Sequence, residues 1–260
     1  IVMLIYSRDW KKWNRWLGYS WILALFVMGT LMKGGIFGLV SVVSTKWSGL
    51  PLTLLLSFFG ILASYPLGVA LALGRQSDLP VIKAFSVVYI ELIRGVPLIT
   101  MLFMSSVMFP LFLPEGVFID KVLRAQVAII IFTAAYVAEV VRGGLQAMDK
   151  GQAEAAESLG LNYLQTMRLV ILPQALKIVI PPTVGILISA FKDTSLVVII
   201  ALYDILNTTK SILNIPEWTG FSTEAYIFVA LIYFFFCFSM SRYSRHIESE
   251  LEYTTEIKSG

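Results

Sequence analysis

Two stretches of the sequence, Trp47 to Gly74 and Gly95 to Pro114, contain no charged residue. A helix needs about 20 predominantly apolar residues to cross the hydrocarbon core of a bilayer. Both runs are continuous rather than alternating, which argues against the period-two pattern of a membrane β-barrel. The whole chain is 57% hydrophobic, above the roughly 45–50% of soluble domains. The sequence therefore predicts an all-α integral membrane protein.

Apolar segments of membrane length predict about six transmembrane helices. They lie near Leu17–Val43, Leu50–Leu73, Ala84–Leu113, Ala125–Arg142, Ile178–Tyr203 and Ala225–Ser241. Lys33, Gly34 and Gly35 interrupt the first of these, and Pro97 predicts a kink in the third. The organisation we expect is a terminal segment, an additional helix, a core domain and a tail, over residues 1–16, 17–43, 44–245 and 246–260.

The distribution of Lys and Arg predicts the orientation, because cytoplasmic loops retain an excess of both. With the polar stretch 150–175 placed inside, thirteen of the 20 Lys and Arg residues fall in cytoplasmic segments and four in external ones. The remaining three lie within predicted helices. We therefore expect both termini and the stretch 150–175 in the cytoplasm, with 205–223 outside.

The polar stretch 150–175 is built from good helix formers and helix-ending residues. Residues 152–159 predict a short helix, and Gly160 is well placed to end it. Asn162, followed three residues later by Gln165, has the pattern of a capping box that starts a second helix.

The second short helix is expected over 163–172, and Pro181–Pro182 predict the start of the next membrane helix. Leu164, Met167 and Ile171 have the spacing of one apolar stripe on this short helix. Two interpretations remain open for the whole stretch. It is either an amphipathic segment on the membrane surface or a docking element for a soluble partner.

Lys192 and Asp193 fall near the middle of the predicted helix 178–203. Charges at such depth are costly, and they usually face a cavity or pair with another helix. Their neighbours Thr194 and Ser195 add hydroxyl groups. The structural interpretation is that each charge pairs with a charge on another helix. The functional one is that these residues border a substrate path, where charges of both signs would suit a zwitterion.

Glu91 and Arg94 lie three residues apart, and Glu139 and Arg142 repeat the spacing. Residues so spaced share a helix face. We expect an intrahelical ion pair for Glu139 and Arg142. For Glu91 and Arg94 an ion pair and a place beside the path remain equally open. If Asp193, Thr194 and Ser195 face the path, Lys192 would pair with a carboxylate such as Glu91 or Glu139, or meet the substrate carboxylate.

The polar stretch resembles a known family motif. Glu154-Ala155-Ala156, three residues, Gly160, nine residues and then Val170-Ile171-Leu172-Pro173 is similar to the E-A-A-x3-G-x9-I-x-L-P loop in the membrane subunits of ABC importers. Val170 replaces Ile in this pattern. Other stretches resemble the polar amino-acid branch of that family: YIELIRGVPL (89–98), AYVAEVVRGGLQAMDKGQ (135–152), LPQAL (172–176) and KDTSL (192–196).

This resemblance implies the permease subunit of a general or acidic-and-neutral L-amino-acid importer, with the type I ABC importer permease fold. It implies cytoplasmic ATPase subunits, a second permease subunit (homologous or identical) and an external solute-binding protein as partners. ATP and Mg would be bound by the ATPase, so no cofactor and no enzymatic activity are expected here. The loop 150–173 would couple to the ATPase through Gln152, Glu154, Ala155, Ala156, Gly160, Leu164 and Pro173. The expected substrate-path residues are Glu91, Arg94, Lys192, Asp193, Thr194 and Ser195.

Other function classes receive less support from the sequence. No G-x-x-x-x-G-K-[ST] phosphate loop occurs, Cys237 is the single cysteine, and the basic residues form no stripe for nucleic acid. No metal site is expected. A secondary transporter or channel without an ATPase, and a membrane scaffold without a path, remain as rivals, but neither needs a docking loop.

Overall fold

The computed structural model describes residues 10–35 and 38–259. The chain divides into two units, Ile1–Trp47 and Ser48–Gly260. The first contains one long helix, and the second contains every other long helix of the described residues.

Helix α1 of the first unit spans Trp10–Lys33. The expectation of one helix over 17–43 is wrong, because the backbone leaves the helical conformation at Gly34 and Gly35. Their φ angles are +66° and +78°, which glycine adopts at little steric cost. The lysine-glycine-glycine sequence therefore ends the helix rather than interrupting it.

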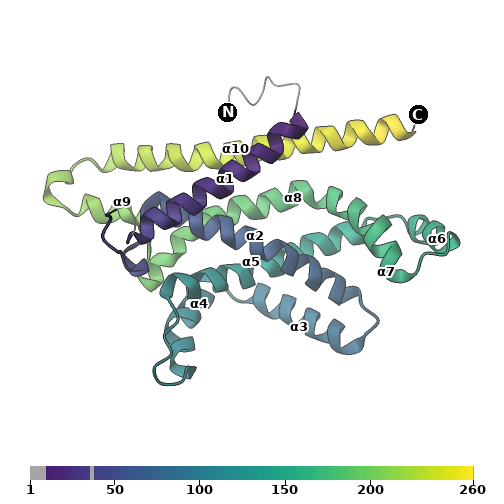
Figure 1. Ribbon diagram of the computed structural model, residues 1–260, viewed down its shortest axis with the longest axis horizontal. Helices are drawn as coiled ribbons and strands as arrows, with labels where there is room; N and C mark the ends of the chain where they lie inside the picture. Colours follow the sequence, from purple (N-terminus) through teal and green to yellow (C-terminus); the bar gives the residue numbers. More distant parts are fainter. Residues whose placement is uncertain (1–9, 36–37, 260) are drawn as a thin grey trace. The chain divides into compact units, whose positions relative to one another are not determined.

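The second unit is a bundle of long helices joined by short ones (Figure 1). Its α-helices are α2 (Gly49–Gln76), α3 (Pro80–Gly95), α4 (Leu98–Phe103), α5 (Lys121–Gln146), α6 (Lys150–Ser158), α7 (Tyr163–Thr166), α8 (Leu172–Asp193), α9 (Ile205–Leu213) and α10 (Ser222–Ser259). Its 3-10 and π turns are η3 (Met104–Met108), η4 (Phe109–Phe112), η5 (Met167–Ile171), η6 (Thr194–Ile200) and η7 (Pro216–Trp218). The two-residue strand β1, Tyr203–Asp204, bridges to Ser48 and Gly49.

Helix α5 forms the centre of this unit. Within the 18-residue apolar stretch of each helix, half of α5 is buried, whereas only 6% of α10 is buried. Glycines allow neighbouring helices to approach closely, as is common in membranes. A Cβ atom added to Gly68 of α2 would lie 2.7 Å from Cβ of Val137 on α5. One added to Gly144 of α5 would lie 3.0 Å from the carbonyl oxygen of Ala175 on α8.

The predicted third membrane helix is broken rather than kinked. Helix α3 ends at Gly95, Val96 is extended, and α4 begins after Pro97, so that the α3 segment and the segment Leu98–Phe112 meet at 102°. Proline disfavours the helical conformation of the preceding residue, and this local effect places the break at Val96.

Two further expectations about helix ends are corrected around α8. Pro181 and Pro182 lie inside α8 and do not start a helix. The short helix over 163–172 does not end there either, because α7 continues into α8 through η5. At this π turn the Leu172 N–H donates to the Met167 carbonyl, an i→i+5 pattern that shifts the hydrogen-bond register just before Pro173, which has no N–H to donate.

Four helical segments are long and apolar enough to cross a membrane: Gly49–Gln76, Lys121–Gln146, Tyr163–Ile200 and Ser222–Glu248. The broken pair that includes α3 and α4 adds a fifth if it is counted as one span. Among the described residues, the structure thus has four or five segments that could span a membrane, and α1 is not one of them. The sequence predicted about six.

Candidate functional site

The coupling segment, residues 150–173, lies at one end of the long helices α5 and α8 (Figure 1). Asp149 caps α6 by accepting a hydrogen bond of 2.9 Å from the Gly151 N–H. Gly160 ends α6 with a φ of +78°, and the Leu161 N–H donates back to the Ala156 carbonyl at 3.2 Å. This is the 6→1 bond of a glycine-ended helix. The predicted stop at Gly160 is confirmed.

The capping box that starts α7 is also present. The Asn162 side chain accepts from the Gln165 N–H at 3.0 Å, and the Gln165 side chain accepts from the Asn162 N–H at 2.9 Å. The two bonds satisfy two of the backbone donors that a helix start leaves open. The geometry of the turn between the two short helices therefore follows from its own sequence.

The outward face of the coupling segment differs from the predicted one. Glu154 and Ala155 are exposed, but Ala156 is only 3% exposed, and Ala153 packs against the core of the bundle. Of the predicted apolar stripe, Leu164 is 75% exposed, whereas Ile171 is buried. Met167 is half-buried and packs against the same core as Ile171. The stripe thus splits, because the helix continues into the bundle and its later turns are covered by it.

The other coupling residues lie at the surface. Gln152, Gly160 and Pro173 are exposed. The side-chain oxygen of Gln152 accepts a hydrogen bond of 3.1 Å from the amide of Gln174, which links α6 to the first turn of α8. Leu159, which the sequence did not single out, is 82% exposed beside this surface. An outward face with carboxylates and apolar side chains, on a base packed into the bundle, can hold a protein partner.

A cluster of ionic side chains joins α2, α3 and α5. The Glu139 carboxylate lies 3.4 Å from guanidinium nitrogens of both Arg75 and Arg94, and it also pairs with Arg142. The Arg75 guanidinium lies 3.0 Å from the Glu91 carboxylate. The predicted pair of Glu139 and Arg142 is confirmed, and the cluster carries three positive charges against two negative ones.

Glu91 and Arg94 take partners on other helices rather than each other. The Arg94 guanidinium also lies 5.8 Å from the centre of the Tyr136 ring, within the range of a cation–π contact. The expected pairing of Lys192 with Glu91 or Glu139 is wrong, because arginines occupy both carboxylates. Sequence reasoning missed Arg75, whose place in the last turn of α2 gave no sign of a partner on α3.

The residues Lys192 to Ser195 lie at the end of α8, not near the middle of a helix as predicted, because the chain tightens into the 3-10 turn η6 at Thr194. Lys192 is exposed and Asp193 half-buried. Thr194 is fully buried, and its hydroxyl donates to the Phe191 carbonyl at 2.8 Å. Ser195 is half-buried, and its carbonyl accepts from the Asn207 amide at 2.9 Å.

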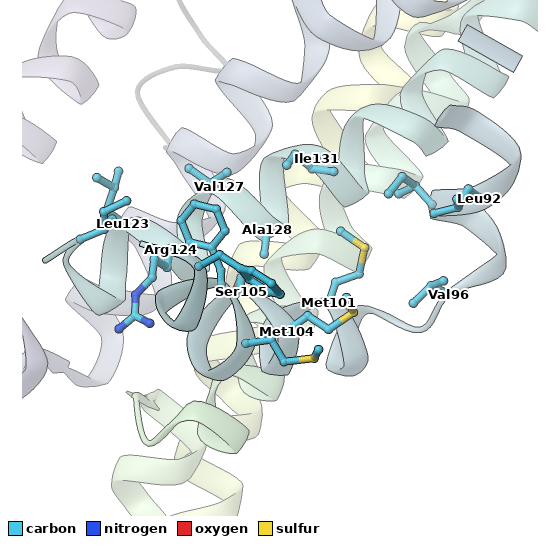
Figure 2. Close-up of a pocket in the computed structure, with 15 residues that line it drawn as sticks. Leu92, Val96, Met101, Met104, Ser105, Leu123, Arg124, Val127, Ala128 and Ile131 are labelled. Atoms are coloured by element: carbon cyan, nitrogen blue, oxygen red, sulfur yellow. The ribbon is translucent and has the colours of Figure 1, made fainter. Parts of the chain in front are cut away.

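Figure 2 shows a pocket lined by α3, α4, the turns η3 and η4, and the first half of α5; its volume is about 570 Å³. Its lining is almost wholly apolar and includes Met101, Met104 and Met108. Arg124 stands at its edge and donates to the Ser106 carbonyl. An ion or zwitterion would find few polar partners there, so this pocket suits an apolar occupant. Within the described residues no three His, Cys, Asp or Glu side chains gather where a metal could bind.

Comparisons with known proteins support the resemblance seen in the sequence. Residues 64–253 match the family described as binding-protein-dependent transport system inner membrane component. The chain is 55% identical over 235 residues to the inner membrane amino-acid ABC transporter permease protein YhdY of Escherichia coli, which covers 90% of this chain and 64% of the relative. It is 46% identical over 234 residues to the glutamate/glutamine/aspartate/asparagine transport system permease protein BztC of Rhodobacter capsulatus, which covers 89% and 54%. The chain thus spans less than two thirds of either relative.

A shorter relative is matched over most of its length. The probable glutamine ABC transporter permease protein GlnP of Bacillus subtilis is 35% identical over 203 residues, or 78% of this chain and 91% of the relative. Among solved structures, a crystal structure of an amino acid ABC transporter with histidines aligns with a TM-score of 0.68 and 34% identity, covering 78% of this chain and 92% of that one. The predicted fold class is confirmed.

Proposed function

Because the chain belongs to the family of binding-protein-dependent transport system inner membrane components, we propose that it is the transmembrane subunit of an ATP-driven importer of polar L-amino acids. It forms a translocation path with a second permease subunit, homologous or identical. It receives its substrate from an external solute-binding protein. ATP and Mg are bound, and ATP is hydrolysed, in the cytoplasmic ATPase subunits.

The observation that carries this proposal is the outward face of the coupling segment. Glu154 and Glu157 are exposed on α6, and the apolar side chains of Leu159 and Leu164 are exposed beside them. Ala153 of α6 packs against the buried core of the bundle, and Ala156 of the same helix is buried. Because packed interiors transmit displacement rather than absorb it, a partner that pulls on this face moves α5 and α8. A segment that merely lies on the membrane would direct its apolar side chains and its carboxylates to different sides.

The substrate class follows from the names of the relatives and from the charges near η6. One relative is named as the permease protein of a glutamate/glutamine/aspartate/asparagine transport system. Exposed Lys192 and half-buried Asp193 are adjacent at the end of α8, where they offer both signs of charge to an amino-acid zwitterion. We propose that Asp193 meets the ammonium group and that Lys192 meets a carboxylate.

Reconstitution tests the function directly. The complex of this chain with its ATPase, second permease subunit and binding protein, in proteoliposomes loaded with ATP, should accumulate labelled L-glutamine or L-glutamate. Liposomes loaded with ADP are the control. Uptake that follows an ion gradient and ignores ATP would instead identify a secondary transporter, and no uptake of any of the four amino acids would refute the substrate class.

We also propose that the chain lies in the bacterial inner membrane with both termini and the coupling segment in the cytoplasm. Single cysteines in a Cys237→Ser background test this at two exposed positions. In intact cells an impermeant maleimide should label Thr219→Cys, between α9 and α10, and leave Glu157→Cys unlabelled until the cells are opened. The reverse pattern would invert the topology.

A further inference from the structure

Asp204, which the sequence analysis did not single out, is fully buried. One carboxylate oxygen accepts from the Asn207 N–H at 3.0 Å and from the Asn207 side-chain amide at 2.6 Å. The other accepts from the Leu206 N–H at 3.2 Å and from the Tyr233 hydroxyl at 2.8 Å. The side chain therefore accepts four hydrogen bonds, which matches the roughly four lone-pair sites of a carboxylate.

These bonds belong to a larger contact among separate segments. The backbone of Asp204 bridges to Gly49, and the Gly49 N–H donates to the Thr208 hydroxyl at 3.0 Å. The Ile205 N–H donates to the Thr53 hydroxyl of α2 at 3.1 Å. Tyr233 adds α10 to the contact. The start of α9 is thus attached both to the first turn of α2 and to the first half of α10.

The same contact reaches the proposed substrate path. The side-chain amide of Asn207 donates to Asp204 and also to the carbonyl of Ser195, in η6. Between Ser195 and Asp204 the chain turns back at Ala201, whose φ of +52° is the left-handed conformation, uncommon for a residue with a side chain. Asp204 and Asn207 therefore hold both ends of the turn that follows Lys192 and Asp193.

We infer that Asp204 is a positioning residue of the transport path, acting through Asn207 to fix η6 and the charged pair that precedes it. The inference rests on the proposed function and assigns a role to a residue that does not itself touch the substrate. Capping α9 would need only the two backbone N–H groups. The bonds from Tyr233 and from the Asn207 side chain go beyond a cap, and they are the ones that tie α10 and η6 to α9.

A double-mutant cycle in the reconstituted complex tests the inference with Asp204→Asn, Asn207→Ala and the double variant. Asparagine remains a good cap, but its amide nitrogen cannot accept a hydrogen bond as the carboxylate oxygen does. The matched control is Thr209→Val on the same helix, whose hydroxyl donates to the Ile205 carbonyl within α9. The measurements are L-glutamine imported per ATP hydrolysed and hydrogen–deuterium exchange of residues 194–200.

We expect L-glutamine import per ATP to fall by about tenfold in either single variant. The double variant should show the same loss and not a larger one, because the effects of substitutions within one hydrogen-bond network do not add. Exchange in 194–200 should rise in all three, with complex yield unchanged, and Thr209→Val should match the wild type. Unchanged import per ATP and unchanged exchange in folded Asp204→Asn would overturn the inference, as would additive losses. If Asp204→Asn does not assemble, Tyr233→Phe, which removes only a hydroxyl, takes its place in the cycle.

The same experiment separates this inference from the proposed function. A wild-type complex that imports neither L-glutamine nor L-glutamate refutes the function. Exchange at 194–200 still reports whether Asp204 positions η6, because that measurement needs no transport. Raised exchange with normal import per ATP would reduce Asp204 to a purely structural residue and would also refute the inference.

Discussion

The two ends of the helix bundle place their polar groups in opposite ways. At the end that carries α6 and α7, the carboxylates of Glu154 and Glu157 are exposed. At the end that carries α9, the Asp204 carboxylate is fully buried and bonded within the chain. Figure 1 shows α6 and α9 at opposite ends of α5 and α8. Exposed polar groups on a firmly packed base point to a partner, whereas buried ones fix the chain to itself, so the two ends should respond differently to substitution.

The largest effect of a substitution on stability is expected at the contact of α5 with α8, the two helices that connect the two ends. A Cβ atom on Gly144 would lie 2.2 Å from a methyl carbon of Val179 and 3.0 Å from the Ala175 carbonyl oxygen, whereas one on the neighbouring Gly143 would meet nothing within 4 Å. Gly144→Ala should therefore cost about 1–3 kcal/mol through overpacking, and a larger residue more. Gly143→Ala should be neutral or slightly stabilising.

Thermal unfolding of the two alanine variants in the same detergent checks this expectation. Because the residues are adjacent on one helix, their difference isolates the contact with α8 from helix propensity. Equal melting temperatures would mean that the helices separate easily here, and the bundle could not transmit movement from one end to the other.

The next effect should be confined to the coupling end. Glu154→Lys reverses an exposed charge, so the variant should melt as the wild type does, while the ATPase retained on co-purification falls by about tenfold. Glu224→Lys, an exposed substitution in the first turn of α10 at the α9 end, is the matched control and should leave retention unchanged. Equal retention in both variants would reduce the coupling segment to a surface helix.

This contrast also explains what the sequence could predict. The coupling end depends on local rules: the stop at Gly160 and the capping box of Asn162 and Gln165 are written within a few residues, and both are confirmed. The partners of Asp204 lie as far away as Tyr233 and cannot be read from spacing. The motif Asp204-x-x-Asn207 before a helix was the available signal, since Asp is a preferred N-cap residue.

The wrong predictions also came from contacts between segments that are distant in the sequence. Ile171 had the spacing of an apolar stripe shared with Leu164, but it is buried in a core that includes Leu71 and Val141, which are distant in the sequence. Pro181 and Pro182 predicted a helix start, yet tertiary packing carries α8 past them. Local sequence preferences therefore determine the conformation of exposed segments, whereas long-range packing overrides these preferences in buried segments.

A smaller effect on stability is expected at the ionic cluster, which joins α2, α3 and α5 near the C-terminal end of each helix. Glu139→Gln removes the carboxylate shared by three arginines and should cost about 2 kcal/mol, since hydrogen bonds to charged groups contribute about 1.5–3 kcal/mol each and the site is partly solvated. Glu91→Gln should cost about 1 kcal/mol or less, because its side chain is 55% exposed. Melting temperatures at low and high salt check the order, and a larger loss for Glu91→Gln would contradict it.

An effect on stability as small as that of Glu91→Gln is expected at Asn162, and it compares the two ends most directly. Asn162 and Asp204 both cap a helix, but Asn162 is exposed and Asp204 is buried. Asn162→Ala should cost about 1 kcal/mol, because water can replace the lost bond to the Gln165 N–H. Asp204→Ala should cost more, since in a buried site it removes the carboxylate that accepts from the Tyr233 hydroxyl and from Asn207, whose side-chain amide keeps only its bond to the Ser195 carbonyl. Hydrogen exchange should rise only at α7 in Asn162→Ala, whereas in Asp204→Ala it should rise across η6 and α9. Equal melting temperatures for both variants would show that water also reaches the Asp204 site, and the distinction between an exposed docking end and a self-bonded end would then fail.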